Sequence, residues 1–293
     1  MYSVIILIKY LPVLRDFKKE KISAANLLIE RNLAKNKHDA EALIIAGKVF
    51  YKNEPVKKSG QMLLKCSEIE IKNTKDFVSR GALKLKKAII EFGISLDGKK
   101  VIDIGSSTGG FTDYMIKNGA LSVIAVDVNY GQFDWKLRNN PDIYLLERTN
   151  IKNLSKNDLP SIPDFATADL SFISIRKVFR NIYDLVADNG EILLLVKPQF
   201  EAEKESVGEK GIITDKTTHL NVIEELIIFL INNYFVELKG ITFSPVKGAK
   251  GNIEFWIYLK KHVNNNYKKN KISYDKIFET IKKVINEAHD KLN

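Results

Sequence analysis

The stretch that decides the fold is VIDIGSSTGGFTD at residues 101–113. It begins as an apolar run broken by Asp103, and Gly105, Gly109 and Gly110 follow. A short buried strand that runs into a glycine-bearing loop is typical of open α/β sheets, which bind cofactors at the carboxyl ends of their strands. The spacing of these glycines differs from the G-x-G-x-x-G pattern of dinucleotide-binding folds. The stretch therefore predicts a cofactor loop that is not a standard dinucleotide loop.

Strand-like and helix-like segments alternate around this stretch, from about residue 78 onward. Short apolar runs of strand character occur at Val101–Ile104, Val123–Val128, Ile143–Leu146, Phe165–Ala168 and Ile192–Val196. Helical periodicity fills the gaps, notably at Gly110–Asn118, Lys177–Val186 and Thr218–Asn232. Strands separated by helices predict an α/β fold with a parallel, doubly wound sheet. Two later runs, Leu238–Phe243 and Ile253–Leu259, have a short glycine-bearing link and predict an antiparallel pair.

Two carboxylates follow the first two strands of this pattern. Asp103 stands two residues before Gly105, where it would repel a phosphate but suit a ligand with an ammonium and a sulfonium group. Asp127 comes 22 residues after Gly105 and could accept hydrogen bonds from ribose hydroxyls. Asp127 alone also fits a nicotinamide dinucleotide, whereas the two carboxylates together favour S-adenosylmethionine.

Four charged residues stand near the expected edges of the sheet. They are Lys84, Asp169, Lys197 and Glu254. Lys197 is the most informative, because it follows five apolar residues and a charge at the mouth of a buried strand is costly unless it is paired. Any one of the four could be an ordinary surface ion pair, but the set predicts a catalytic group.

The charge of the chain is concentrated at its ends. Of the net +10, residues 1–79 hold 15 basic and 9 acidic side chains, and residues 260–293 hold 9 and 4. The middle of the chain, 80–259, holds 22 and 23. A near-neutral body with basic ends indicates a polyanionic partner, nucleic acid before membrane. The alternative, that the lysines only aid solubility, stays open.

Cysteine content and hydropathy exclude several classes of protein. Cys66 is the only cysteine, so the chain has no intrachain disulfide and no cysteine-based zinc site. We expect no bound metal ion and a reducing, cytoplasmic location. No apolar run approaches the roughly 20 residues that a spanning helix needs, so we expect no stable membrane insertion.

Six motifs carry a resemblance to a known family. In order they are DIGSSTGGFTD, VDVNYGQFDWKLR, LERTN, ADLSFIS, LLVKPQFE and GNIEFWIYL. Together they resemble the TlyA (haemolysin A) family of ribosomal RNA methyltransferases, over residues 23–260. The resemblance implies a Rossmann-type S-adenosylmethionine-dependent methyltransferase sheet after a small α+β S4-like RNA-binding domain. It also implies methylation of the ribose 2′-hydroxyl of cytidine in 16S and 23S ribosomal RNA, within the 30S and 50S subunits.

The resemblance implies domain boundaries and residue roles. We expect a leader of undefined role at 1–22, the S4-like domain at 23–71, a linker at 72–79, the methyltransferase domain at 80–260 and a basic tail at 261–293. The catalytic K-D-K-E tetrad would be Lys84, Asp169, Lys197 and Glu254. The cofactor would be bound by Asp103, Gly105, Ser107, Gly109, Gly110, Asp127, Asn150 and Asp169. The RNA phosphates would meet Lys35, Lys37, Lys48, Lys52, Lys57 and Lys58.

The sequence departs from the family in its first helix and leaves one other function open. Ser23-Ala24-Ala25 stands where the family has an R-L-D-like triplet, so that part of the RNA contact is not expected here. The loop Glu201–Gly211 is expected to close over the substrate. The competing function is a haemolysin, a membrane-lytic activity that the family name records. The sequence makes no prediction about the oligomeric state.

Overall fold

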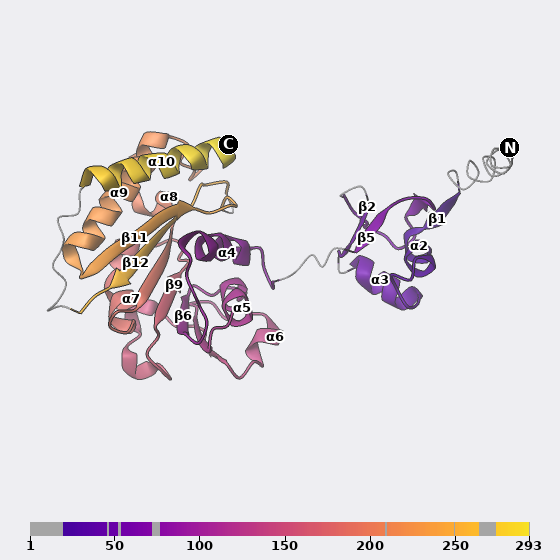
Figure 1. The fold of residues 1–293 in the computed structure, drawn as a ribbon, viewed down its shortest axis with the longest axis horizontal. Helices are drawn as coiled ribbons and strands as arrows, with labels where there is room; N and C mark the ends of the chain where they lie inside the picture. Colours follow the sequence, from indigo (N-terminus) through magenta and orange to yellow (C-terminus); the bar gives the residue numbers. More distant parts are fainter. Residues whose placement is uncertain are drawn as a thin grey trace, which may run out of the picture. The chain divides into compact units, whose positions relative to one another are not determined.

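The computed structural model describes residues 20–45, 47–51, 54–71, 77–208, 210–248, 250–263 and 274–292. The chain divides at residue 76 into two compact units, which are described separately (Figure 1). Residues 1–19 of the expected leader and 72–76 of the expected linker lie outside the described residues, as do Lys52 and 264–273 of the expected tail.

The N-terminal unit is a small α+β structure with its own core. Its elements are β1 (Lys21–Ser23), α2 (Ala24–Glu30), α3 (Lys37–Ile45), β2 (Val49–Tyr51), β3 (Glu54–Pro55), β4 (Met62–Leu64) and β5 (Ile69–Ile71). The side chain of Ser23 caps α2, because its Oγ accepts a hydrogen bond from the Asn26 N–H at 3.3 Å. Leu27 and Leu28 of α2 are fully buried. Because β1 pairs with β4 from Lys21 onward, the folded unit begins two residues before the expected boundary at 23.

The C-terminal unit is built on one open sheet. Its strands are β6 (Lys100–Ile104), β7 (Ser122–Val126), β8 (Ile143–Leu146), β9 (Phe165–Ala168), β10 (Glu191–Val196), β11 (Val236–Phe243) and β12 (Phe255–Lys261). Within the described residues these strands lie in the order β11-β12-β10-β9-β6-β7-β8. The pairs among β6 to β10 are parallel, and β12 is antiparallel to both β10 and β11. The predicted α/β fold with an antiparallel pair at the end of its sheet is confirmed.

Helices cover both faces of this sheet (Figure 1). They are α4 (Gly81–Phe92), α5 (Gly110–Lys117), α6 (Trp135–Arg138), α7 (Phe179–Leu185), α8 (Pro198–Glu201), α9 (Lys216–Asn233) and α10 (Tyr274–Leu292). Because side chains alternate along a strand, Leu193 and Leu195 of β10 pack in the cluster that contains α4 and α5. Ile192, Leu194 and Val196 pack in the cluster that contains α7, α9 and α10.

The helix α10 belongs to this unit. The sequence set it apart as a basic tail, but Ile277, Ile281 and Ile285 are buried in the same core as α7 and α9. His289, also on α10, lies with its Nε2 2.9 Å from Nδ1 of the buried His219 on α9. The helix α10 is therefore part of the layer that packs on this face of the sheet together with α7 and α9. Within the described ranges, no helix has both the length and the apolar character needed to cross a bilayer.

The order of the strands fixes where a ligand can enter. The chain runs from β6 to β7 and β8 on one side of β6, and then crosses to β9 and β10 on its other side. The loops that follow β6 and β9 therefore leave the sheet in opposite directions. Such a switch point opens a crevice at the carboxyl ends of the strands.

Candidate active site

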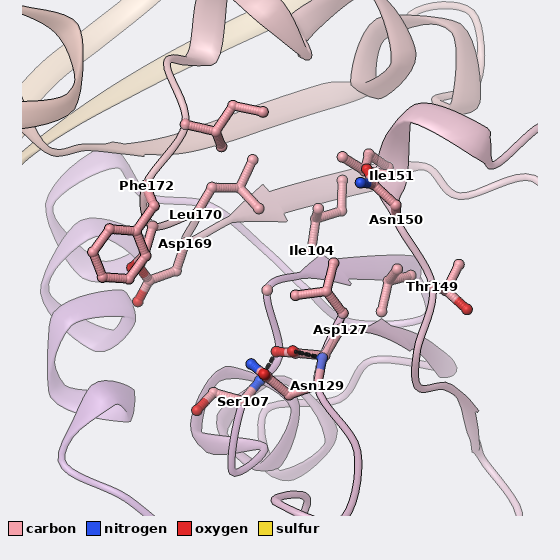
Figure 2. A pocket seen from close by; sticks show the side chains of 15 residues that line it. Ile104, Ser107, Asp127, Asn129, Thr149, Asn150, Ile151, Asp169, Leu170 and Phe172 are labelled. Atoms are coloured by element: carbon pink, nitrogen blue, oxygen red, sulfur yellow. Dashed lines mark hydrogen bonds between the residues drawn. The ribbon is translucent and has the colours of Figure 1, made fainter.

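A cavity of about 480 Å³ lies at this switch point. Its walls come from the carboxyl ends of β6, β7 and β9 and from the loop after β8. The lining residues are Ile104, Gly105, Ser107, Val126, Asp127, Val128, Asn129, Thr149, Asn150, Ile151, Asp169, Leu170, Ser171, Phe172 and Ile173. Figure 2 shows Asp127 between a wall that carries Thr149 and Asn150 and a wall that carries Asp169 and Phe172.

The carboxylate of Asp127 is held in place by two backbone groups. Its Oδ2 accepts a hydrogen bond from the Ser107 N–H at 2.7 Å, and its Oδ1 accepts one from the Asn129 N–H at 2.8 Å (Figure 2). A carboxylate oxygen can accept more than one hydrogen bond, so both oxygens can still receive hydroxyl protons from a ligand. This arrangement suits the diol of a ribose.

Gly105 lets the loop after β6 approach the end of β9. Its φ is +85°, and a Cβ atom at this position would lie 2.3 Å from the carbonyl oxygen of Asp169. No side chain fits at that distance, so only glycine permits both the turn and the contact. The loop that borders the cavity is thereby packed directly on Asp169, the residue that follows β9.

Three expected cofactor residues do not line the cavity. Asp103 is fully buried, because the pleat of β6 turns it, like Val101, toward the α5 face, where its Oδ2 accepts a hydrogen bond from Thr112 Oγ1 at 2.6 Å. Burial raises the pKa of Asp103 to about 7, and among the described residues its Oδ1 has no partner. Gly109 and Gly110 face protein atoms, with ideal Cβ positions 2.5 Å and 2.1 Å from neighbouring side chains.

The four charged residues predicted from the sequence come together in an unbroken series of opposite charges. Glu254 Oε2 lies 2.6 Å from Lys84 Nζ, which lies 4.0 Å from Asp169 Oδ2. Asp169 Oδ1 lies 2.6 Å from Lys197 Nζ. Lys84 comes from α4, Asp169 follows β9, Lys197 follows β10 and Glu254 precedes β12. Two positive and two negative charges leave the cluster neutral, as burial of ionised groups requires.

Burial makes the cluster sensitive to the loss of any member. The side chain of Glu254 is 3% exposed and that of Lys197 is 11% exposed. Burial raises the pKa of Glu254, and the nearby Lys84 opposes that increase. Gly248 makes room for this carboxylate, since a Cβ atom on Gly248 would lie 2.5 Å from Glu254 Oε1.

A second cavity of about 310 Å³ borders the cluster. Its lining residues are Lys84, Ser171, Phe172, Lys197, Gln199, Phe200, Val207, Gly211, Gly248, Lys250, Asn252 and Glu254. Ser171 and Phe172 line both cavities and so form their common wall. The two cavities can therefore hold two ligands with the charged cluster between them.

Two residues on the common wall were missed by the sequence reasoning. Phe172 is 88% exposed, has a φ of +64°, and its ring centroid is 5.2 Å from that of Phe200. The Oγ of Ser171 accepts a hydrogen bond from Lys197 Nζ at 2.8 Å. The available signal was their position directly after Asp169, in a loop that follows a buried strand.

The expected mobile loop is anchored at both ends. At its start, Glu201 accepts hydrogen bonds from Ser174 Oγ at 2.7 Å and from the Ile175 N–H at 2.6 Å. At its end, the Nδ2 of the buried Asn252 donates to the Gly211 carbonyl at 2.8 Å. Closure of the segment between these anchors over a substrate stays a prediction.

The candidate RNA-binding lysines of the N-terminal unit are accessible. Lys35, Lys37, Lys57 and Lys58 are exposed, and Lys48 is half-buried. None of these five lies in an ion pair with a carboxylate among the residues that the structure describes. Their ammonium groups are therefore available to an external anion.

The cavities fit a methyl donor and an acceptor. Asp127 suits the ribose hydroxyls of S-adenosylmethionine, and the amide of Asn150 on the same cavity suits the edge of its adenine. The lysines of the charged cluster border the second cavity, where an acceptor hydroxyl would lie. In the described part of the chain, no group of three or more His, Cys, Asp or Glu residues is arranged to hold a metal ion.

Known proteins share this sequence and fold. A family model described as FtsJ-like methyltransferase matches residues 77–261. A Bacillus subtilis (strain 168) protein with the provisional name rRNA methyltransferase YqxC is 43% identical over 83% of this chain and 86% of its own length. The 16S/23S rRNA (cytidine-2'-O)-methyltransferase TlyA of Mycobacterium tuberculosis is 35% identical over 80% of this chain and 87% of its own length. A solved structure from Streptococcus thermophilus, named as a hemolysin, is 36% identical with a TM-score of 0.70, over 92% of this chain and 96% of that chain.

These matches confirm the resemblance to TlyA proteins and the methyltransferase activity that it implies. The matched region begins at 77, within the start of the C-terminal unit, and ends at 261, the last residue of β12. It contains both cavities and all four residues of the charged cluster. This chain belongs to the FtsJ-like methyltransferase family.

Proposed function

We propose that this chain methylates the ribose 2′-hydroxyl of cytidine in 16S and 23S ribosomal RNA, within the 30S and 50S subunits. The observation that carries the proposal is the neutral series of lysines and carboxylates between two adjoining cavities. S-adenosylmethionine is the methyl donor. The acceptor is taken from the printed name of the Mycobacterium tuberculosis relative. Ribosomal RNA as substrate implies a cytoplasmic enzyme.

The first cavity is the proposed cofactor site. Asp127 would accept hydrogen bonds from the ribose hydroxyls, and Asn150 would meet the adenine. Gly105 and Ser107 would border the rest of the molecule with their backbone atoms. When bound, S-adenosylmethionine supplies a methyl group that its sulfonium already activates, so the protein has to supply alignment and an acceptor oxygen.

Lys197 is the proposed base. A ribose hydroxyl is a poor nucleophile at neutral pH, so a nearby group has to take its proton. The Nζ of Lys197 lies at the second cavity, and in its neutral form the nitrogen lone pair accepts that proton and later releases it to solvent. Asp169 would orient this amine, since it lies 2.6 Å away.

Lys84 and Glu254 complete the proposed tetrad. Lys84 borders the second cavity and can hold the ribose or stabilise the negative charge that develops on its oxygen. Glu254 pairs with Lys84 at 2.6 Å and keeps its Nζ in one place. The cluster is neutral before RNA binds, so it attracts no phosphate by itself.

The N-terminal unit is the proposed RNA-binding, S4-like domain. Its support is the set of exposed lysines without carboxylate partners in the described residues, together with the α2 and α3 helices. Contacts from lysine to phosphate position RNA without reading its sequence, and they weaken as salt displaces them.

The test is transfer of labelled methyl groups from S-adenosylmethionine to isolated 30S and 50S subunits, followed by mapping of the modified nucleotide. The Lys197→Ala variant should lose methyl transfer and keep its affinity for S-adenosylmethionine, because Lys197 does not line the first cavity. Lys177→Ala, which changes an exposed lysine outside both cavities, is the matched control. A Lys197→Ala protein with most of its activity would contradict the assignment.

The haemolysin function predicts a different result for Lys197→Ala. A lytic protein has no need of a catalytic lysine, so Lys197→Ala protein would still lyse erythrocytes if lysis were intrinsic to the chain. We expect no lysis from either protein. Modification of one subunit alone would narrow the proposed substrate to that subunit.

A further inference from the structure

We propose that Ser171 is a positioning residue for Lys197, a role that rests on the proposed function. Ser171 lies in the loop after β9, two residues after Asp169, and it lines both cavities. Its Oγ accepts a hydrogen bond from Lys197 Nζ at 2.8 Å. Among the described residues, Asp169 and Ser171 are the side chains with which Lys197 forms an ion pair or a hydrogen bond.

A hydrogen bond to Ser171 and an ion pair with Asp169 restrain the direction in which the amine of Lys197 points. The Nζ atom has three tetrahedral positions besides its bond to Cε. One of them donates a hydrogen bond to Ser171 Oγ at 2.8 Å. Asp169 Oδ1 attracts the amine as an ion-pair partner at 2.6 Å without a hydrogen bond to it, so the hydrogen bond to Ser171 is the directional restraint on the positions that remain for an RNA hydroxyl in the second cavity, which Lys197 lines. With Asp169 alone, the amine could rotate about the Cε–Nζ bond and present its lone pair elsewhere.

This direction matters at the moment of methyl transfer. The 2′-O–H bond breaks, its proton moves to the lone pair of Lys197 Nζ, and the oxygen forms its new bond to the methyl carbon. The bond between that carbon and sulfur breaks with its electron pair left on sulfur, so charge and atoms balance. The amine has to lie along the O–H direction while the oxygen is aligned with the methyl group, and such alignment is a large part of the catalytic effect. Ser171 therefore contributes to the rate without contacting the methyl group.

A neutral hydroxyl suits this position better than a second carboxylate. A hydroxyl oxygen accepts a hydrogen bond from Nζ in both states of the amine, because the neutral amine still carries two hydrogens and its lone pair stays available to the substrate. Ser171 can thus hold Lys197 in both of its protonation states. A carboxylate would favour the charged state only, in which the lysine cannot act as base.

The experiment compares Ser171→Ala, Ser171→Thr and Ser174→Ala with the unaltered chain. Ser174 is a matched control, because it lies in the same loop but donates to Glu201 at 2.7 Å and not to the lysine. A hydrogen bond to a charged group corresponds to roughly a 10- to 100-fold change in rate. We therefore expect kcat of Ser171→Ala to fall by about 10- to 100-fold. The melting temperature should stay unchanged, and kcat should change by a larger factor than KM for RNA or the affinity for S-adenosylmethionine, since Ser171 only borders the two cavities.

The threonine variant separates positioning from mere occupancy of space. It keeps a hydroxyl at an exposed position, so it should recover most of the lost kcat. Ser174→Ala should lower the melting temperature more than it lowers kcat, because its hydrogen bonds hold the loop and not the amine.

Each contrary result has its own meaning. Full kcat in Ser171→Ala, no recovery in Ser171→Thr, or an equal fall in Ser174→Ala would each overturn the positioning role. If the unaltered chain transfers no methyl group to either ribosomal subunit, the proposed function fails instead, and the four proteins would be indistinguishable in the assay.

Discussion

Replacing Lys84 with methionine should leave a buried carboxylate without its counter-ion. Glu254 is 3% exposed at its side chain, and Lys84 Nζ at 2.6 Å is its ion-pair partner. Methionine keeps most of the length and volume of lysine but carries no charge. Removal of one partner of a buried ion pair typically destabilises a protein by about 3–5 kcal/mol, because the other charge stays desolvated. We expect a loss of that size for Lys84→Met at pH 8.

The loss should depend on pH in one direction. Burial raises the pKa of Glu254 above its ordinary value near 4.5, and Lys84 opposes this rise, so Lys84→Met raises the pKa further. The folded state then holds its proton to a higher pH than the unfolded state does. Stability that the protonated form provides is fully present below the unfolded pKa and is lost as the pH rises through the folded pKa. The difference between the variant and the unaltered chain should therefore be small at pH 5 and large at pH 8.

Urea unfolding of four proteins measures this effect: the unaltered chain, Lys84→Met, Glu254→Gln and the double variant. In the double variant the buried charge is gone, so most of the lost stability should return at pH 8. An equal loss of unfolding free energy by Lys84→Met at pH 5 and pH 8, or no recovery when Glu254→Gln is added, would show that a buried carboxylate charge is not the cause.

Three further predictions concern other parts of the chain. Gly105→Ala should abolish binding of S-adenosylmethionine in calorimetry and lower the melting temperature, since the added Cβ would lie 2.3 Å from the carbonyl oxygen of Asp169. Unchanged binding would contradict the close approach of Gly105 to Asp169. The double variant Lys57→Ala/Lys58→Ala should reduce the slope of the logarithm of the RNA-binding constant against the logarithm of the salt concentration by about 1.4 to 1.8. An unchanged slope would show that neither lysine contacts the RNA. Burial and the neighbouring imidazole lower the pKa of His219 to about 4, so its contribution to stability is present above pH 6.5 and is lost as the pH falls toward 4. Between pH 7 and pH 5, the free energy of unfolding measured in urea should fall by about 2 kcal/mol more for the unaltered chain than for His219→Gln. Equal falls in the two proteins would exclude this histidine as the cause.

The sheet was predictable because its signal is local. The β10 run Ile192–Val196 is apolar throughout, as a strand buried on both faces must be, and the structure extends it by one residue to Glu191. The three-residue strands β1 and β4 were not predicted. The predicted start of the N-terminal unit was late for this reason.

The charged cluster was predictable in its members but not in its contacts. Lys197 stood out because a lysine after a buried strand needs a partner, and Asp169 is that partner. Asp103 was predicted to bind the cofactor, but the pleat of β6 directs its side chain to α5 and not to the cavity, and a position in the sequence does not specify which face of a strand is which. Sequence also provided no reason to select Ser171, since a serine in a loop has many ordinary uses and only its 2.8 Å distance to Lys197 distinguishes it.

In the proposed function, catalysis and RNA binding are carried by different parts of the chain, and the distribution of charge fits this division. The cluster of two lysines and two carboxylates is neutral, and the central part of the sequence, 80–259, is close to neutral as well. A strongly positive catalytic centre would bind any phosphate. A neutral centre avoids unspecific binding, but it cannot gather RNA over a distance. In the proposed function the long-range attraction comes from exposed lysines outside the cluster, such as those of the N-terminal unit, where salt screens it, while the ion pairs of the cluster are buried and screened much less.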